Sequence, residues 1–99
     1  MVYVIYHLVM KFEYDPSKSQ SNKAKHGLDF EEAQALWDDP GIVIAPAQSE
    51  TEPRYLVVGR VQDVFWTAVI TYRDDATRII SVRRSRKMEA MHYDKINHG

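Results

Sequence analysis

The sequence contains no cysteine, which excludes disulfide bonds and catalysis by a thiolate. It also lacks an HExxH motif, a Cys/His quartet and any compact group of Asp, Glu and His of the kind that metal-dependent hydrolysis needs. We therefore expect a functional site that uses neither a metal ion nor another cofactor.

An export signal and a membrane-spanning segment are missing as well. The opening residues 1–10 are apolar but are interrupted by His7, and they have no leading basic region and no small-residue cleavage signal. This pattern predicts a cytoplasmic protein without a membrane partner.

A large excess of positive charge is also absent, because the net charge is only -1. General nucleic-acid-binding domains are usually strongly basic. The two halves differ, however: residues 1–53 hold four Lys/Arg and nine Asp/Glu, whereas residues 54–99 hold nine and five, so their net charges are -5 and +4. Cationic chemistry is therefore expected in the C-terminal half.

The remaining composition is that of a soluble globular protein, with 44% hydrophobic and 27% charged residues. A chain of 99 residues makes one domain that is large enough to bury a core but too small for a deep active site. We assign residues 1–99 to this domain, with 11–97 as its folded body. Residues 1–10 are either an N-terminal extension or part of an extended first strand.

Two helices are predicted after a short first strand at 11–15. The first helix begins at Pro16 after the N-cap Asp15 and ends at Gly27. The second begins after Asp29, with Glu32 placed to complete a capping box, and ends near residues 38–40. Its apolar face comprises Phe30, Ala33, Leu36 and Trp37.

Three or four strands are predicted next, at 41–45, 54–61, 64–73 and 77–84. Short joints at 62–63 and 74–76 favour an antiparallel meander. A polar loop bounded by prolines covers 46–53, and Ser85 can cap a final helix. The prediction is an α+β fold with an antiparallel sheet of four to five strands, two N-terminal helices packed on it and a C-terminal helix.

The most informative segment is 78–87, which holds five basic residues and no acidic one. Guanidinium groups bind phosphate in a bidentate geometry and keep their charge, so this segment fits a polyanion or a phosphorane-like transition state. Strict alternation along a strand places Arg78 and Arg84 on one face and Arg83 on the other. A solvated basic edge is the alternative interpretation.

Motifs along the chain resemble those of the BrnT family of bacterial toxins. The resemblance covers residues 12–93 and rests on these segments: Phe12-Glu13-Tyr14-Asp15-Pro16, Asn22, Lys25-His26-Gly27, Phe30-Glu31-Glu32-Ala33, Asp39-Pro40, Arg54-Tyr55, Gly59, Tyr72-Arg73, Arg78-Ile79-Ile80-Ser81-Val82-Arg83-Arg84, Glu89 and Tyr93. Two positions depart from the family pattern, because Tyr14 stands where Trp is usual and Ser85 where Ala is usual.

The resemblance implies a RelE-like fold and an endoribonuclease toxin of a type II toxin-antitoxin module, which arrests translation by cutting RNA. It also implies neutralisation by a ribbon-helix-helix antitoxin resembling BrnA, in a complex that we expect to be a heterotetramer. Operator DNA would be contacted only through that antitoxin.

Metal-independent RNA cleavage uses the 2'-hydroxyl as nucleophile and needs a proton acceptor, a proton donor and cations around the phosphate. The catalytic candidates are His26, Arg60, Arg83, Glu89 and Tyr93. The substrate-binding candidates are Tyr14, Lys18, Lys25, Arg54, Arg78 and Arg84. This interpretation requires Arg54, Arg60 and Arg83, from different strands, to converge on one phosphodiester.

Each candidate also has a structural interpretation. His26 can simply cap helical carbonyls, the arginines can form ion pairs, Tyr14 can belong to the core instead of stacking on a base, and Glu89 with Tyr93 can be a helix-surface pair. The alternative function is a non-catalytic domain of the same fold that binds RNA or the antitoxin.

Overall fold

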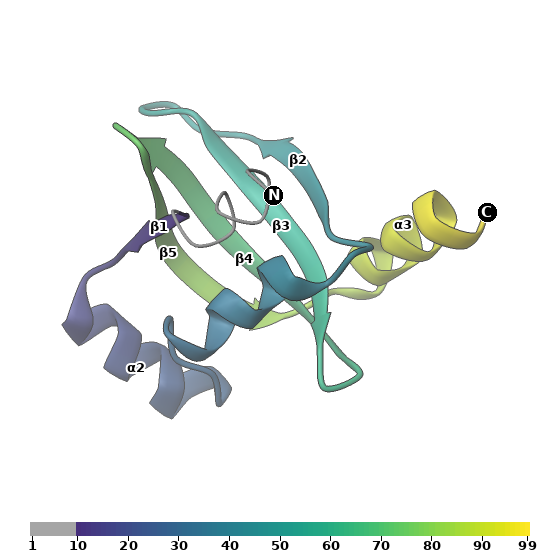
Figure 1. Ribbon diagram of the computed structural model, residues 1–99, viewed down its shortest axis with the longest axis horizontal. Coiled ribbons are helices and arrows are strands. Elements are labelled where there is room, and N and C mark those ends of the chain that lie inside the picture. The colour runs from purple at the N-terminus through teal and green to yellow at the C-terminus, as the bar shows by residue number, and fades with distance from the viewer. Residues whose placement is uncertain (1–9) are drawn as a thin grey trace, which may run out of the picture.

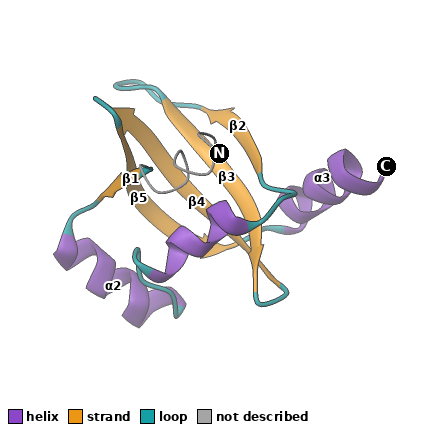
Figure 2. Cartoon of the chain, viewed as in Figure 1, coloured by secondary structure: helices purple, strands orange, loops and turns teal. Residues whose placement is uncertain are grey.

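The computed structural model describes residues 10–99 and shows a five-stranded sheet with helices at its faces and one end (Figures 1 and 2). The strand order is β1-β5-β4-β3-β2. The elements are β1 (Lys11–Glu13), α2 (Pro16–His26), the 3-10 helix η1 (Glu32–Asp38), β2 (Val43–Ala47), β3 (Arg54–Val61), β4 (Val64–Arg73), β5 (Ala76–Arg84) and α3 (Lys87–His98). The expectation for residues 1–9 lies outside the described part of the chain.

The predicted α+β class is confirmed, but the sheet is mixed instead of antiparallel. Strands β2 to β5 form the predicted antiparallel meander. Strand β1 instead pairs with β5 in parallel, with Lys11 opposite Ala76 and Glu13 opposite Arg78. Alternation of side chains identifies a strand but carries no information on its direction, so the sequence did not reveal this pairing.

The joints of the meander have the backbone that tight hairpins require. Gln62 and Asp63 have φ values of 51° and 65°, and Asp74 has a φ of 55°. Positive φ at both central residues is the property of the hairpin turns whose twist matches that of paired strands. The predicted two-residue joint at 62–63 is therefore confirmed.

Helix α2 has the predicted limits and both predicted caps. The Asp15 carboxylate accepts a hydrogen bond from the Ser17 N–H at 2.9 Å. At the other end Gly27 adopts a φ of 90° and its N–H donates to the Lys23 carbonyl at 2.9 Å. The left-handed residue ends the helix and directs the chain toward η1.

We expect Gly27→Ala to lower the free energy of unfolding by about 1 kcal/mol, because an L-residue is disfavoured in the left-handed region. A Cβ at this position meets no atom within 4 Å, so the cost is conformational and not steric. Urea denaturation measures it, with Gly27→Asn as the control, since asparagine tolerates this backbone better. Equal stability of all three proteins would contradict the argument.

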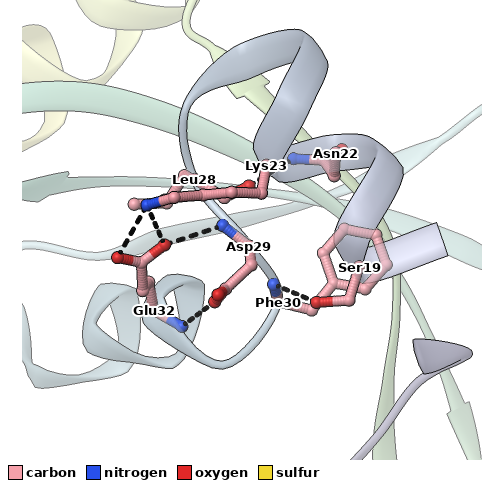
Figure 3. A network of polar contacts seen from close by, with 7 residues as sticks. All are labelled: Ser19, Asn22, Lys23, Leu28, Asp29, Phe30 and Glu32. Atoms are coloured by element: carbon pink, nitrogen blue, oxygen red, sulfur yellow. Dashed lines mark hydrogen bonds and ion pairs between the residues drawn. The ribbon is translucent and has the colours of Figure 1, made fainter. Parts of the chain in front are cut away.

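The second predicted N-terminal helix is the short 3-10 helix η1, so α2 is the one α-helix that precedes β2 among the described residues. Its capping box does form: the Glu32 N–H donates to Asp29 at 2.7 Å and the Asp29 N–H donates to Glu32 at 3.0 Å (Figure 3). The buried residues Phe30, Ala33 and Leu36 are spaced by three. That spacing fits 3.0 residues per turn as well as 3.6, so it did not distinguish the two helix types.

Polar contacts join α2 to the start of η1 (Figure 3). The Phe30 N–H donates to the Ser19 hydroxyl at 2.9 Å, and Lys23 Nζ pairs with Glu32 at 2.8 Å. Asn22 reaches further, because its amide donates to the Leu28 carbonyl and accepts from the Val82 N–H of β5. Helix α2 is thereby fixed against the edge of the sheet.

The hydrophobic core lies between the 28–36 segment and one face of the sheet. We call this face the core face and the opposite one the outer face. The buried core residues are Leu28, Phe30, Ala33, Leu36, Val57, Trp66, Ala68, Ile70, Ile79 and Val82. Figure 1 shows η1 lying across the sheet, while α3 projects away near β2 and β3.

A β-bulge in β5 changes which arginines share a face. Val69 pairs with Ser81 and Ile70 with Ile79, so Ile80 has no partner in β4. Both Ile79 and Val82 are buried in the core although they are three residues apart. The extra residue inverts the alternation. Arg78 and Arg83 therefore share the outer face, and the expectation that Arg78 shares a face with Arg84 is wrong.

Candidate functional site

Arg83, at the end of β5, forms a bidentate ion pair with Glu89 of α3. Its two terminal nitrogens lie 2.8 Å from the two carboxylate oxygens. The side chains are 25% and 15% exposed, so water screens the pair only partly. This parallel geometry fixes the plane of the guanidinium as well as its position.

Glu89 has further partners that hold it in place. Its Oε1 accepts from the Thr67 hydroxyl at 2.9 Å and from the Arg86 N–H at 2.8 Å. The Thr67 hydroxyl also lies 2.7 Å from that of Ser85. The prediction that Ser85 caps the final helix is wrong, because α3 begins at Lys87 and its N-cap is Arg86. The Glu89 carboxylate accepts from the Arg86 N–H.

Hydrogen bonding to Arg83 is the main cause that lowers the pKa of Glu89 to about 2; burial opposes it, and the Arg86 N–H and Thr67 bonds assist. A carboxylate with such a pKa stays ionised near neutrality and accepts protons poorly. A general base works best when its pKa lies near the working pH. Glu89 therefore suits the orientation of Arg83 better than proton abstraction.

This low pKa makes part of the stability sensitive to acid. The folded-state pKa is about 2 against an ordinary 4.5, so the contribution is complete above pH 4.5 and is lost as the pH falls toward 2. We expect a loss on the order of 3 kcal/mol in the free energy of unfolding over that window. Urea denaturation at pH 7, 4 and 3 measures it. In Glu89→Gln this component should be absent; an unchanged acid dependence would contradict the assignment.

A second polar cluster surrounds Asp39, which follows η1. Its carboxylate accepts from the Gly41 N–H and the Arg60 N–H, each at 2.8 Å. The Tyr93 hydroxyl of α3 donates to the same carboxylate, with contacts of 3.0 and 2.9 Å. One carboxylate thus joins the segment before β2, the end of β3 and the C-terminal helix.

Tyr93 is almost completely buried, with 5% of its surface exposed. Burial, followed by the neighbouring Asp39 carboxylate, raises its pKa. Burial also acts to raise the pKa of Asp39, but the three hydrogen bonds outweigh it and the pKa lies below its usual value. The hydroxyl is committed to Asp39, so the structure favours an anchoring role for Tyr93.

A shallow cleft of about 290 Å³ lies between α2 and β5, and we call it the α2–β5 cleft. It is lined by Lys18, Ser21, Asn22, Lys25, His26, Phe30, Ile80 and Ser81. The predicted stripe of Lys18, Lys25 and His26 is therefore on one surface. Asn22 is one helical turn before His26 and bonds to Val82, the residue before Arg83, so the cleft lies beside the strand end that carries Arg83.

The other predicted arginines have separate surroundings. Arg60 pairs with Asp63 at 3.0 Å and lies over the Phe65 ring. Arg78 pairs with Glu13 at 3.6 Å. Arg84 lies over the Trp66 ring. Arg54 is half-buried, and its Nε has no hydrogen-bond partner among the described residues. Tyr14 contacts Phe30 edge to face at 5.7 Å, which is a core contact.

The three arginines Arg54, Arg60 and Arg83 do not form one pocket. Arg54 and Arg60 share a face of β3, as predicted, but they lie at its two ends. Six residues of extended strand separate them by about 20 Å. Arg60 and Arg83 each have an acidic partner. A single phosphate therefore does not contact all three.

The described residues contain no group of three or more His, Asp or Glu placed to hold a metal ion, and no helix among them is long and apolar enough to cross a bilayer. Residues 14–89 match the family model described as ribonuclease toxin, BrnT, of type II toxin-antitoxin system. The chain belongs to the BrnT family. No curated protein matches it significantly.

Two residues of the candidate site were not predicted to function from the sequence. Thr67 is fully buried and bonds to Glu89, and Asp39 bonds to Tyr93. Asp39 did carry a signal, since an Asp-Pro pair at the end of a helix is one of the motifs that resemble the family. Thr67 lies inside an apolar strand and carried none.

Proposed function

We propose that this BrnT-family chain is an endoribonuclease that cleaves RNA by attack of the 2'-hydroxyl on the adjacent phosphodiester, without a metal ion. Membership of a family of ribonuclease toxins supports RNA as the target. The observation that carries the proposal is the α2–β5 cleft, which gathers Lys18, Lys25 and His26 beside β5, the strand that carries Arg83.

In the proposed reaction His26 accepts the proton of the 2'-hydroxyl as the new P–O2' bond forms. Negative charge develops on the phosphorus oxygens, and Arg83 stabilises it. The P–O5' bond then breaks, leaving a 2',3'-cyclic phosphate and a 5'-oxygen that takes a proton from solvent. The ion pair with Glu89 already fixes the orientation of the Arg83 guanidinium, and one edge of it stays available for the phosphate. Arg83 therefore needs little reorganisation in the transition state.

Lys18 and Lys25 are exposed and positioned to contact phosphates that flank the cleavage site. Further substrate-binding contacts along the sheet would come from Arg54, Arg78 and Arg84. Arg60 would contact a phosphate near the end of β3. Tyr93 would serve as an anchor of α3, and Tyr14 would contribute at the cleft only through its contact with Phe30.

The proposed setting is a cytoplasmic type II toxin-antitoxin module with a RelE-like toxin fold. The partner would be a BrnA-like ribbon-helix-helix antitoxin in a heterotetramer, and only that antitoxin would contact operator DNA. The family description supports an antitoxin partner in general.

The direct test is cleavage of a single-stranded RNA by the purified chain in EDTA. We expect products with 2',3'-cyclic phosphate ends. We expect no cleavage after a nucleotide whose 2'-hydroxyl has been removed. His26→Ala should reduce the rate about 100-fold or more if the imidazole transfers the proton. Dependence on added Mg²⁺ would overturn the metal-independent mechanism.

A non-catalytic domain is the second candidate, favoured by the ion pairs that occupy Arg60 and Arg83. RNA binding without cleavage, under conditions in which the chain is folded, would establish it. Such binding should weaken with salt, because Lys and Arg contacts to phosphate release counterions.

A further inference from the structure

The C-terminal helix α3 has an apolar surface that no described residue covers. Tyr93 is its only buried residue. Met88, Met91 and Ile96 are 74%, 53% and 57% exposed. With His92 they occupy positions i, i+3, i+4 and i+8, which form one stripe along the helix. Isolated exposed apolar residues are common, but a contiguous stripe of this kind marks an interaction surface.

An apolar groove continues this stripe onto the outer face of the sheet. The α3–β2 groove has a volume of about 180 Å³ and is lined by Val43, Ala45, Leu56, Val58, Met88, Glu89 and His92. Strand β2 is the last strand of the sheet, so one of its edges is free within residues 10–99. Methionine side chains adapt to an incoming apolar group, which suits them to such a surface.

The charge next to the groove indicates the chemistry of its occupant. Arg86 and Lys87 are exposed where β5 leads into α3, and neither has an ion pair within the described part of the chain. The positive end of the helix dipole lies at the same place. An acidic segment with apolar anchors is therefore complementary to this surface.

A second copy of this chain fits the surface less well. A two-fold interface would place the same patch of each copy against the other. That interface would bring Arg86 and Lys87 of both copies together, and like charges in one interface weaken it.

We propose that the α3–β2 groove and the stripe of Met88, Met91 and Ile96 dock an acidic, amphipathic segment of the antitoxin. The proposal rests on the proposed function for the existence of an antitoxin and adds where it binds. Glu89 lines the groove and holds Arg83, so an occupant of the groove contacts the helix that orients the phosphate ligand. Docking there would couple antitoxin binding to the ribonuclease site.

The test measures binding of the antitoxin polypeptide encoded with this chain, by calorimetry, to Met88→Glu/Met91→Glu and to Met10→Glu. Met10 is 42% exposed and precedes β1 at the other edge of the sheet, so it is a matched control. We expect the dissociation constant to rise about 100-fold or more for the double variant, as for residues at the centre of an interface. For Met10→Glu it should change less than about threefold.

Charge is tested with Arg86→Glu/Lys87→Glu against Lys11→Glu, an exposed cation on β1. The double variant should bind the antitoxin about tenfold more weakly at low salt, and the difference should shrink as salt is added. Unweakened binding in both double variants would overturn the proposal. A free chain that is dimeric, and that Met88→Glu/Met91→Glu makes monomeric, would assign the surface to a second copy instead.

RNA cleavage by the free variants separates this proposal from the proposed function. Neither methionine lines the α2–β5 cleft, so free Met88→Glu/Met91→Glu should cleave RNA as fast as the parent chain and should escape neutralisation by the antitoxin. A parent chain that binds the antitoxin but does not cleave RNA would refute the catalytic function and leave the docking surface intact.

Discussion

Arg83→Ala is expected to lower the rate of RNA cleavage by about 1,000-fold, because it removes a preorganised charge-stabilising donor from the reacting phosphate. The variant should also lose about 1–3 kcal/mol of unfolding free energy, since Glu89 then lacks its bidentate partner. The ion pair with Glu89 is the reason that stability as well as activity is expected to fall.

Two controls separate catalysis from stability in this experiment. Thr67→Val removes a buried hydrogen bond to Glu89 and should destabilise the fold while retaining the guanidinium. Arg83→Lys keeps the charge but not the bidentate geometry, so its rate should lie between those of the parent and of Arg83→Ala. Rates are compared at a temperature at which every variant is folded. Full activity of Arg83→Ala there would contradict the assignment.

Asp39→Ala is expected to lower the free energy of unfolding by about 3 kcal/mol, because it leaves two backbone N–H groups and the Tyr93 hydroxyl without their acceptor. Gly41 makes the cluster compact: a Cβ built there would lie 2.5 Å from the Tyr93 hydroxyl oxygen. Urea denaturation at pH 7 measures the loss.

Tyr93→Phe is the matched control for Asp39, because it removes only one of the three donors. It should cost about 1 kcal/mol, and the aromatic contact between residue 93 and Phe65 should persist. Equal losses in the two variants would mean that the backbone contacts of Asp39 contribute nothing. A pronounced increase of hydrogen exchange in α3 is expected for both variants, since Tyr93 is the buried residue of that helix.

Much of the fold followed from local rules that act within a few residues. The caps Asp15 and Gly27, the capping box of Asp29 with Glu32 and the limits of β3 and β4 all agree with the sequence. Each depends on backbone preferences or hydrogen bonds between near neighbours, which residue types reveal directly.

The features that the sequence did not predict depend on contacts between residues that are distant along the chain. The parallel direction of β1 and the bulge at Ile80 are set by pairing between segments more than sixty residues apart or across a hairpin, and no short pattern encodes them. The same applies to the site. Sequence spacing placed Lys18, Lys25 and His26 on one surface, but it did not show that Arg83 meets Glu89 or that Tyr93 is committed to Asp39.

The bulge in β5 sets the face of the sheet on which each of the two adjacent arginines lies. Ile79 and Ser81 pair with neighbouring residues of β4, and Ile80 between them is skipped. As a result Arg83 lies toward Glu89 and Arg84 lies toward Trp66. If Ile80 instead paired with β4, the residues after it would change face, and Arg83 and Arg84 would exchange destinations without any change of charge. The unpaired residue therefore decides which of the two arginines meets Glu89.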